Sequence, residues 1–283
     1  SGVLSGMLKT HSLTAGIPVY PSIATKLQLL LPNQINDAGK PPYDEGYIGG
    51  RSGTKITQTA GTEFEVTVNV VDTYWNIIRN LTPAPVVKLQ TTDKYAIVPS
   101  TKALVNGTTT FVLTLLTAAT YYEGIMYTGA TNYIFAYVTE SPIQLSTAPS
   151  GPVFTLPNQP TQLMVVLPGE YCVPGSTSTL GRGGTPINFV AGSTYTVSVY
   201  LVDDYYNRVS SDVPVVKVWT TDPADSPVGA DEKQLSAGRE TFNINMITAN
   251  DTSAGTFDKD GNPIPSQWNI RVQDIDGEEP DFT

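Results

Sequence analysis

Two acidic stretches of this 283-residue sequence carry side chains suited to binding a divalent cation. In the first, Asp258, Asp260 and Asn262 alternate, as in the start of a calcium loop, where oxygen ligands converge on one hard cation. The loop lacks its closing glutamate, and Asp-Gly-Asn is also an ordinary hairpin turn. The second stretch contains Asp274 and Asp276. These five residues are candidate Ca²⁺ ligands, and the sequence predicts no other cofactor.

A second polar pattern occurs twice, as Asp72 with Asn76 and as Asp203 with Asn207. Asp and Asn side chains commonly hydrogen-bond the backbone of a tight turn, so we expect these four residues to structure turns at strand ends. A Ca²⁺ site at the end of a domain is the alternative, and Asp204 would add a carboxylate in the second copy.

Residue types that enzymes commonly use are scarce. A single histidine, His11, excludes a Ser-His-Asp triad within either copy and any two-histidine metal site. A single cysteine, Cys172, excludes an intrachain disulfide. Asp93 and Asp222 recur in a duplicated Thr-Thr-Asp motif, and no carboxylate spacing indicates a glycosidase. We therefore expect a protein that is not an enzyme.

The composition narrows the range of partners. The formal net charge of −10 repels phosphate backbones, so we expect no nucleic-acid binding. No run of 18 apolar residues occurs, so we expect no membrane insertion. The hydrophobic content of 40% is enough for a sizeable core.

The sequence contains an internal repeat. Five blocks recur in the same order, between 129 and 136 positions later. The paired blocks are 25–32 with 161–168, 60–68 with 191–199, 72–76 with 203–207, 86–93 with 215–222, and 110–118 with 241–249. Such collinear matches indicate a tandem duplication.

Each block has the period of a β-strand. Phe64, Val66 and Val68 alternate with polar residues, which predicts one buried face, and no window has a helical stripe. About seven short strands per copy predict an all-β protein of two tandem immunoglobulin-like β-sandwich domains. The expected organisation is an extended N-terminal segment (1–23), repeat 1 (24–142), a Pro-rich linker (143–159) and repeat 2 (160–283).

The repeated motif is similar to that of a known family. Ala60-Gly61-Thr62 with the first Asp–Asn pair, and Ala191-Gly192-Ser193 with the second, resemble the tandem immunoglobulin-like repeats of large bacterial surface proteins. More distantly they resemble bacterial Ig-like and filamin-type repeats. The resemblance covers nearly the whole chain except residues 1–9, and it implies an extracellular or cell-surface stalk, adhesin or filament.

Residues 14–21 resemble the inter-repeat segment 150–157, so residues 1–9 would match the end of a preceding repeat. We expect this N-terminal segment to pair with an exposed sheet edge of a neighbour, as a donated strand does. Three tyrosines without a counterpart in repeat 2 are further contact candidates, for a neighbour or a sugar ring. The interface candidates are Val3, Leu4, Met7, Leu8, Tyr121, Tyr122 and Tyr127.

Asn80, Asn106 and Asn250 fit the N-glycosylation pattern. The predicted function is an extracellular structural protein, a subunit or segment of a filament, sheath or stalk built from repeats joined end to end. Its expected partners are further copies or adjoining repeats of the same protein. The alternative is an adhesin or a pair of carbohydrate-binding modules that recognises a glycan.

Overall fold

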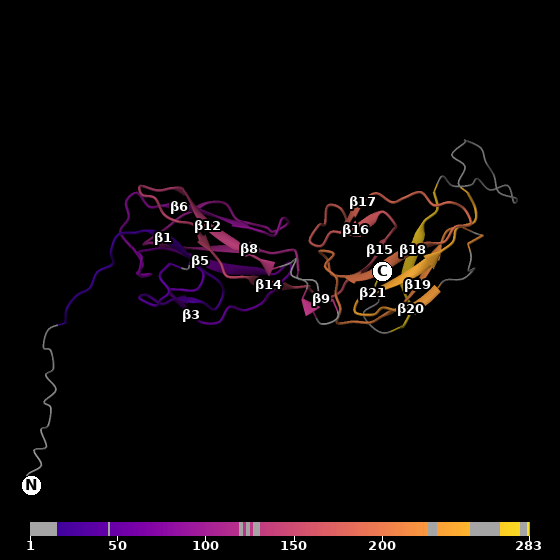
Figure 1. Cartoon of the computed structure of the whole chain (residues 1–283), viewed down its shortest axis with the longest axis horizontal. Coiled ribbons are helices and arrows are strands. Elements are labelled where there is room, and N and C mark those ends of the chain that lie inside the picture. Colours follow the sequence, from indigo (N-terminus) through magenta and orange to yellow (C-terminus); the bar gives the residue numbers. More distant parts are fainter. Residues whose placement is uncertain are drawn as a thin grey trace, which may run out of the picture.

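A computed structural model describes most of the chain and shows an all-β protein (Figure 1). The described residues are 16–44, 46–118, 121–122, 125–126, 131–222, 224–225, 231–249, 267–277 and 282. None of them lies in a helix, which confirms the predicted fold class. It follows that this part of the chain contains no helix able to cross a membrane.

Repeat 1 contains two antiparallel sheets that face each other. The first has the order β1 (Lys26–Leu30), β5 (Glu63–Val71), β8 (Thr108–Thr114), and the second has the order β13 (Ala148–Pro149), β12 (Ile134–Glu140), β6 (Val86–Thr91), β7 (Lys102–Ala103). Leu29, Phe111 and Val66 come from the first sheet and Leu89 and Ile134 from the second, and all five belong to one buried cluster. The apolar face of each sheet therefore forms a sandwich core.

Repeat 2 also contains two antiparallel sheets, and its described residues give the second sheet three strands where that of repeat 1 has four. One sheet has the order β15 (Gln162–Val166), β18 (Tyr195–Val202), β21 (Arg239–Ile244), and the other has the order β20 (Asp231–Gln234), β19 (Val215–Thr220), β22 (Ile270–Asp274). Val197, Val199 and Leu201 of β18 alternate inward and join Val216 and Phe242 in a separate buried cluster. Figure 1 shows the two groups of strands following each other along the long axis.

Short hairpins lie outside these sheets. They are β2 (Ile35–Asn36) with β3 (Arg51–Ser52), β9 (Tyr121–Tyr122) with β10 (Ile125–Met126), and β16 (Glu170–Cys172) with β17 (Arg182–Gly184). The hairpins of β2–β3 and β16–β17 occupy matching positions in the two repeats, between the first strand and the long central strand.

The segment 143–159, expected to be a linker, contains two strands of the first sandwich, β13 and β14 (Val153–Leu156). β14 pairs antiparallel with β11 (Thr131–Asn132) and parallel with β4 (Gln58–Thr59). Val153 and Thr155 of β14 are only 3% and 0% exposed, because they point into repeat 1. Only residues 157–161 therefore lie between β14 and β15.

Candidate functional site at the joint between the repeats

A tight turn follows β18 at the end of repeat 2 that faces repeat 1. The N–H of Asp203 donates to the carbonyl of Asn207 (3.0 Å), and the N–H of Tyr206 donates to the carbonyl of Asp203 (2.9 Å). Tyr206 has a φ of 61°, in the left-handed region, so the chain reverses sharply there. The turn brings Asp203 and Asn207 together.

The buried carboxylate of Asp203 organises this turn. Its Oδ1 accepts hydrogen bonds from the N–H groups of Tyr205 and Asn207, both at 2.9 Å. The Asn207 amide donates to both carboxylate oxygens, at 3.2 and 3.0 Å. Oδ2 also accepts the N–H of Asn158 at 2.8 Å. The same side chain thus fixes the turn and the segment that enters repeat 2.

The side chain of Asn207 crosses from repeat 2 to repeat 1. Its Nδ2 donates to the carbonyl of Leu116 (2.9 Å), and its Oδ1 accepts the N–H of Ala118 (2.8 Å). The residue is 2% exposed. Two opposite hydrogen bonds from one planar amide define both the position and the rotation of the neighbouring backbone, so this contact is a specific one.

Repeat 1 presents that backbone in a fixed conformation. Asp93, of the Thr-Thr-Asp motif, accepts the N–H groups of Leu116 (2.7 Å) and Thr117 (2.9 Å) on Oδ2. The Thr117 hydroxyl donates to Oδ1 at 2.7 Å. Asp93 therefore holds residues 116–118 in the shape that Asn207 contacts.

Two glycines allow close approach across the same joint. A Cβ on Gly61, whose φ is +77°, would lie 2.0 Å from the ring of Tyr205, so this ring packs directly on the glycine. A Cβ on Gly175 would lie 2.4 Å from Thr117 Oγ1. Asn158 adds a hydrogen bond from Nδ2 to the carbonyl of Ala60 (3.3 Å). We call this set of contacts the joint.

The equivalent turn of repeat 1 has the same internal geometry. Asp72 accepts the N–H groups of Tyr74 (2.8 Å), Asn76 (3.0 Å) and Ser22 (2.9 Å). Burial acts to raise the pKa of Asp72, but these bonds and the Asn76 amide outweigh it and leave the pKa below its ordinary value. Within the described residues, Asn76 bonds this carboxylate and has no contact like that of Asn207 with another repeat.

Asp222 repeats the role of Asp93 in repeat 2. Its Oδ2 accepts the N–H groups of Ile247 (2.7 Å) and Thr248 (2.8 Å), and Oδ1 accepts the N–H of Ala224 (3.0 Å). Burial acts to raise the pKa of Asp222, but the bonds from Thr248, Ala224 and Ile247 outweigh it and lower the pKa below its ordinary value.

This lowered pKa predicts a loss of stability in acid. A carboxylate with a lower pKa in the folded state stabilises the fold above its unfolded pKa of about 4, and that contribution is lost as the pH falls through the folded value. Asp222→Asn should therefore weaken the dependence of the unfolding free energy on pH as the pH falls below about 5. Urea unfolding across this range measures the slope. Asp204→Asn, at an exposed carboxylate elsewhere in repeat 2, is the control, and an unchanged slope in the Asp222 variant would contradict the assignment.

Two of the Ca²⁺ candidates lie within the structure and bond to backbone. Asp274 accepts the N–H groups of Asp276 and Phe282, both at 3.4 Å, and Asp276 accepts the N–H of Val215 at 3.1 Å. Across the described ranges, no three His, Cys, Asp or Glu side chains gather as a metal site would require. Calcium binding stays a prediction.

Several other predicted residues lie outside the described part of the chain: Asp258, Asp260, Asn262, Asn250, Val3, Leu4, Met7, Leu8 and Tyr127. The backbones of Tyr121 and Tyr122 form β9, and their side chains are not described. Asn80 and Asn106 are both exposed. Glycosylation and the tyrosine contacts stay predictions.

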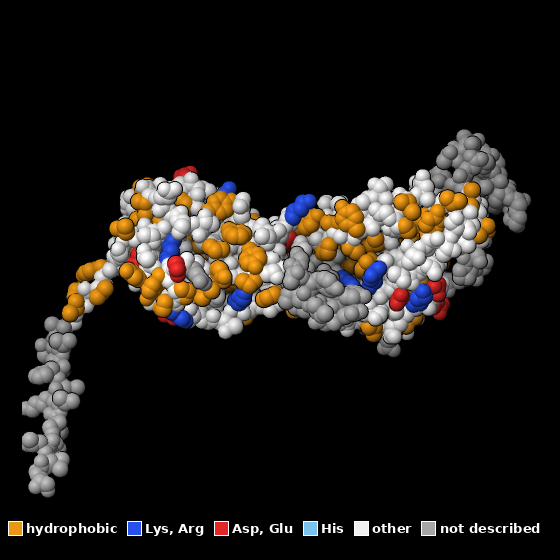
Figure 2. Space-filling model, in the orientation of Figure 1, with side chains coloured by type: hydrophobic (Ala, Val, Ile, Leu, Met, Phe, Trp, Pro, Cys, Tyr) orange, Lys and Arg blue, Asp and Glu red, His pale blue; other side chains and the backbone are white. Residues whose placement is uncertain are grey.

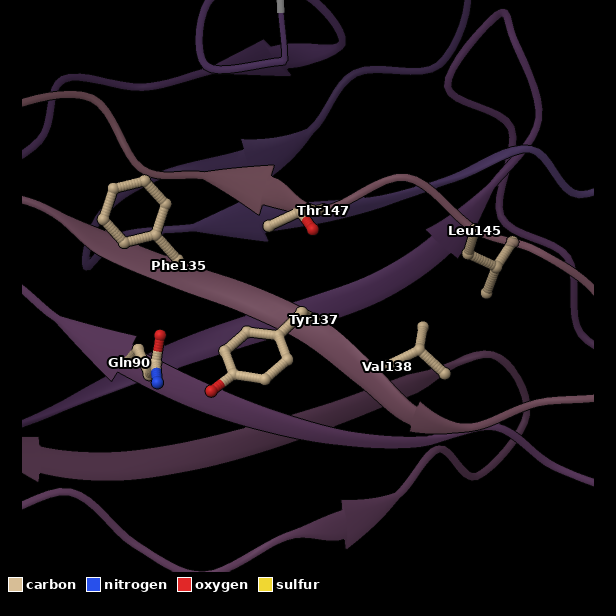
Figure 3. A pocket seen from close by; sticks show the side chains of 6 residues that line it. All are labelled: Gln90, Phe135, Tyr137, Val138, Leu145 and Thr147. Atoms are coloured by element: carbon tan, nitrogen blue, oxygen red, sulfur yellow. The ribbon is translucent and has the colours of Figure 1, made fainter.

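A shallow hollow lies on the outer face of repeat 1, beside β12 (Figure 3). Phe135 and Tyr137 project to the same side of this strand, two positions apart, and Gln90 of β6 is the cross-strand partner of Phe135. Lys88 Nζ lies 4.8 Å from the centre of the Tyr137 ring. In β22, Arg271 takes the place of Phe135 and Gln273 takes the place of Tyr137. The aromatic pair is therefore specific to repeat 1.

Comparison with known proteins identifies no family: no family model matches the sequence, and no curated protein matches it. Among solved structures, the chain is similar to β-glucuronidase 3 of Bacteroides uniformis, with 13% identity and a TM-score of 0.21 over 66% of this chain and 20% of that one. It is similar to a Ca²⁺-stabilized adhesin with which an Antarctic bacterium binds ice, with 12% identity and a TM-score of 0.22 over 78% and 40%. It is also similar to the FN1–FN3 domains of chicken CNTN1, with 11% identity and a TM-score of 0.17 over 80% and 65%.

The chain thus spans less than two thirds of each of these three structures. With TM-scores near 0.2, no function of this protein follows from theirs.

Proposed function

We propose that this chain is part of an extracellular structural protein, a filament, sheath or stalk, in which immunoglobulin-like sandwiches are joined end to end. The observation that supports this most is the joint. Asn207 is buried between the two repeats and bonds the backbone of Leu116 and Ala118 in both directions. A protein that holds its units in line needs such a directional contact, whereas a flexible tether does not.

The distribution of polar side chains supports the same proposal. The duplicated aspartates each accept several backbone hydrogen bonds, which is a structural use of a carboxylate. Asp93 holds the surface of repeat 1 at the joint, and Asp203 holds the surface of repeat 2. The most specialised polar groups of the repeat therefore serve the contact between units, and we propose no enzymatic role.

Asn207→Ala tests this proposal, and Asn76→Ala is its matched control. Both variants lose the same bonds within the turn, but only the first loses the bonds across the joint. We expect Asn207→Ala to weaken the docked arrangement by about 1–3 kcal/mol, since it leaves a buried N–H and carbonyl without partners. Pulsed electron paramagnetic resonance between spin labels at the exposed Thr101 and Ser211, in a Cys172→Ser background, measures the distance distribution between the repeats.

The distribution should be narrow in the unmodified chain and in Asn76→Ala, and broad in Asn207→Ala. A distribution that is already broad in the unmodified chain would contradict a rigid joint and with it the proposed function.

Glycan binding by an adhesin or carbohydrate-binding module is the second candidate. The hollow in Figure 3 favours it, because two partly exposed aromatic rings side by side form a surface on which a sugar ring can stack. A glycan array probed with the whole chain distinguishes the two functions.

A further inference from the structure

The end of repeat 1 that faces away from repeat 2 carries the same groups that form the joint on repeat 2. Tyr74 and Asn76 match Tyr205 and Asn207 in sequence and in their turn. Gly39 matches Gly175, because the N–H of each donates to the carbonyl of the turn tyrosine, Tyr74 at 2.7 Å and Tyr205 at 2.8 Å. A Cβ on Gly39 would meet no heavy atom within 4 Å. Tyr74 is 51% exposed. Tyr43 of the same repeat packs edge-on against Tyr74, with ring centres 5.2 Å apart. No described residue of another repeat lies on this surface, so we treat it as a docking surface without its partner.

The segment before repeat 1 matches the segment that contains β14. Ser22 donates to Asp72 Oδ2 as Asn158 donates to Asp203 Oδ2, which sets the alignment. Ile17 and Val19 then correspond to the buried Val153 and Thr155 of β14.

Ile17 and Val19 are 83% and 89% exposed, however. Figure 2 shows the segment as a narrow arm with hydrophobic side chains that leaves the first sandwich. We call residues 16–21 the arm. The arm has the side-chain pattern of β14, but no described sheet lies against it.

The far end of repeat 2 has the complementary features. Asp222 holds Ile247 and Thr248 as Asp93 holds the backbone that receives Asn207. Gly192 matches Gly61, and space around its Cβ position is open, whereas Gly61 is covered by Tyr205.

No described residue of repeat 2 pairs with the edge that would receive a strand. In repeat 1, Ala60 is buried and its N–H donates to the carbonyl of Leu156 in β14 (2.9 Å). The matching Ala191 is exposed, and the adjacent Val190 is 63% exposed. Among the described residues of repeat 2, no strand occupies the place that β14 has in repeat 1.

We propose that a second copy of this chain docks end to end on the first. The arm of one copy lies along residues 189–190 of the other as its missing strand, and Asn76 of the first copy bonds the backbone of residues 247–249. This inference rests on the proposed function, because it extends the joint inside the chain to a contact between chains. The contact joins two different surfaces, so it propagates into a linear chain of copies.

The first test changes the arm in the full-length chain. Ile17→Asp with Val19→Asp places two negative charges on the face that would be buried. Tyr20→Asp places one negative charge on the opposite face, at the position that matches the exposed Leu156. Sedimentation velocity of the unmodified chain should show coefficients that increase with protein concentration. We expect this increase to disappear in the double variant and to persist in Tyr20→Asp. All these positions are exposed, so folding is preserved.

The second test determines which residues of the arm lie opposite which residues of the neighbouring copy. Tyr20 and Val190 correspond to Leu156 and Thr59, which are partners in the β14–β4 pairing. The full chain with Cys172→Ser, Tyr20→Cys and Val190→Cys should oxidise to a ladder of linked copies on a non-reducing gel. Each single-cysteine variant should stop at a dimer.

A chain that stays monomeric at all concentrations, or an association equally weakened by Tyr20→Asp, would overturn the inference. The distance distribution within one chain is independent of this result. A narrow distribution in a strictly monomeric chain would remove the contact between copies and leave the proposed function in place.

Discussion

Replacing Asp203 with alanine is expected to lower the free energy of unfolding of repeat 2 by about 3–5 kcal/mol. Asp203 is fully buried, and its carboxylate accepts the N–H groups of Tyr205, Asn207 and Asn158 together with the Asn207 amide. Each buried donor left without an acceptor costs about 1–3 kcal/mol. Urea unfolding followed by the fluorescence of Trp219 and Trp268, the tryptophans of repeat 2, measures the change.

Asp204→Ala is the control, because this neighbouring aspartate is exposed. It should change the unfolding free energy by about 0.5 kcal/mol or less. Asp203→Asn keeps one acceptor and should fall between the two. Equal effects of the substitutions at positions 203 and 204 would show that the carboxylate of Asp203 does not organise the turn.

Replacing Gly61 with alanine is expected to open the joint. The new Cβ would lie 2.0 Å from the Tyr205 ring, a distance at which the ring must move away. Gly61 also has a φ of +77°, which costs a residue with a Cβ about 1 kcal/mol. Nuclear relaxation of backbone amides measures the rotational correlation time of each repeat separately, and we expect both times to shorten as the repeats begin to move independently.

Gly192→Ala is a closely matched control for this substitution. Gly192 has a φ of +78° and no heavy atom within 4 Å of its Cβ position. In the monomeric chain it should show the same backbone cost and unchanged correlation times. If both variants behaved alike, the close contact between Gly61 and Tyr205 would have no part in holding the joint.

Much of the fold was predictable from local patterns. The alternation in Phe64, Val66 and Val68 predicts β5, and the duplication predicts a second set of strands of the same kind. The Asp–Asn spacing predicts a turn because the bonds that form it lie within five residues of sequence. Local patterns such as these depend on neighbours in sequence.

β14 was not predictable because its partners are distant. Its sequence lies between Pro152 and Pro157, and this composition is typical of a linker. Its pairing with β4 joins residues almost 100 positions apart. A pattern within a short stretch of sequence cannot indicate a pairing over that distance.

The role of Asn207 was hidden for a different reason. Asn76 and Asn207 lie in nearly the same local sequence, yet only one is buried against another repeat. Burial of that kind depends on which unit lies next to the turn. The one sequence signal was the recurrence of small residues, Gly61 and Gly192, at the positions where two units meet or would meet.

Only residues 157–161 separate β14 from β15, and this short tether sets how strong the joint needs to be. A short covalent connection gives the two surfaces an effective concentration of the order of millimolar. Hydrogen bonds worth about 1 kcal/mol each then suffice to keep the repeats docked. Two separate copies have no such tether. Between them, the apolar face of the arm has to supply the affinity that the covalent link supplies inside the chain, and assembly becomes a function of protein concentration.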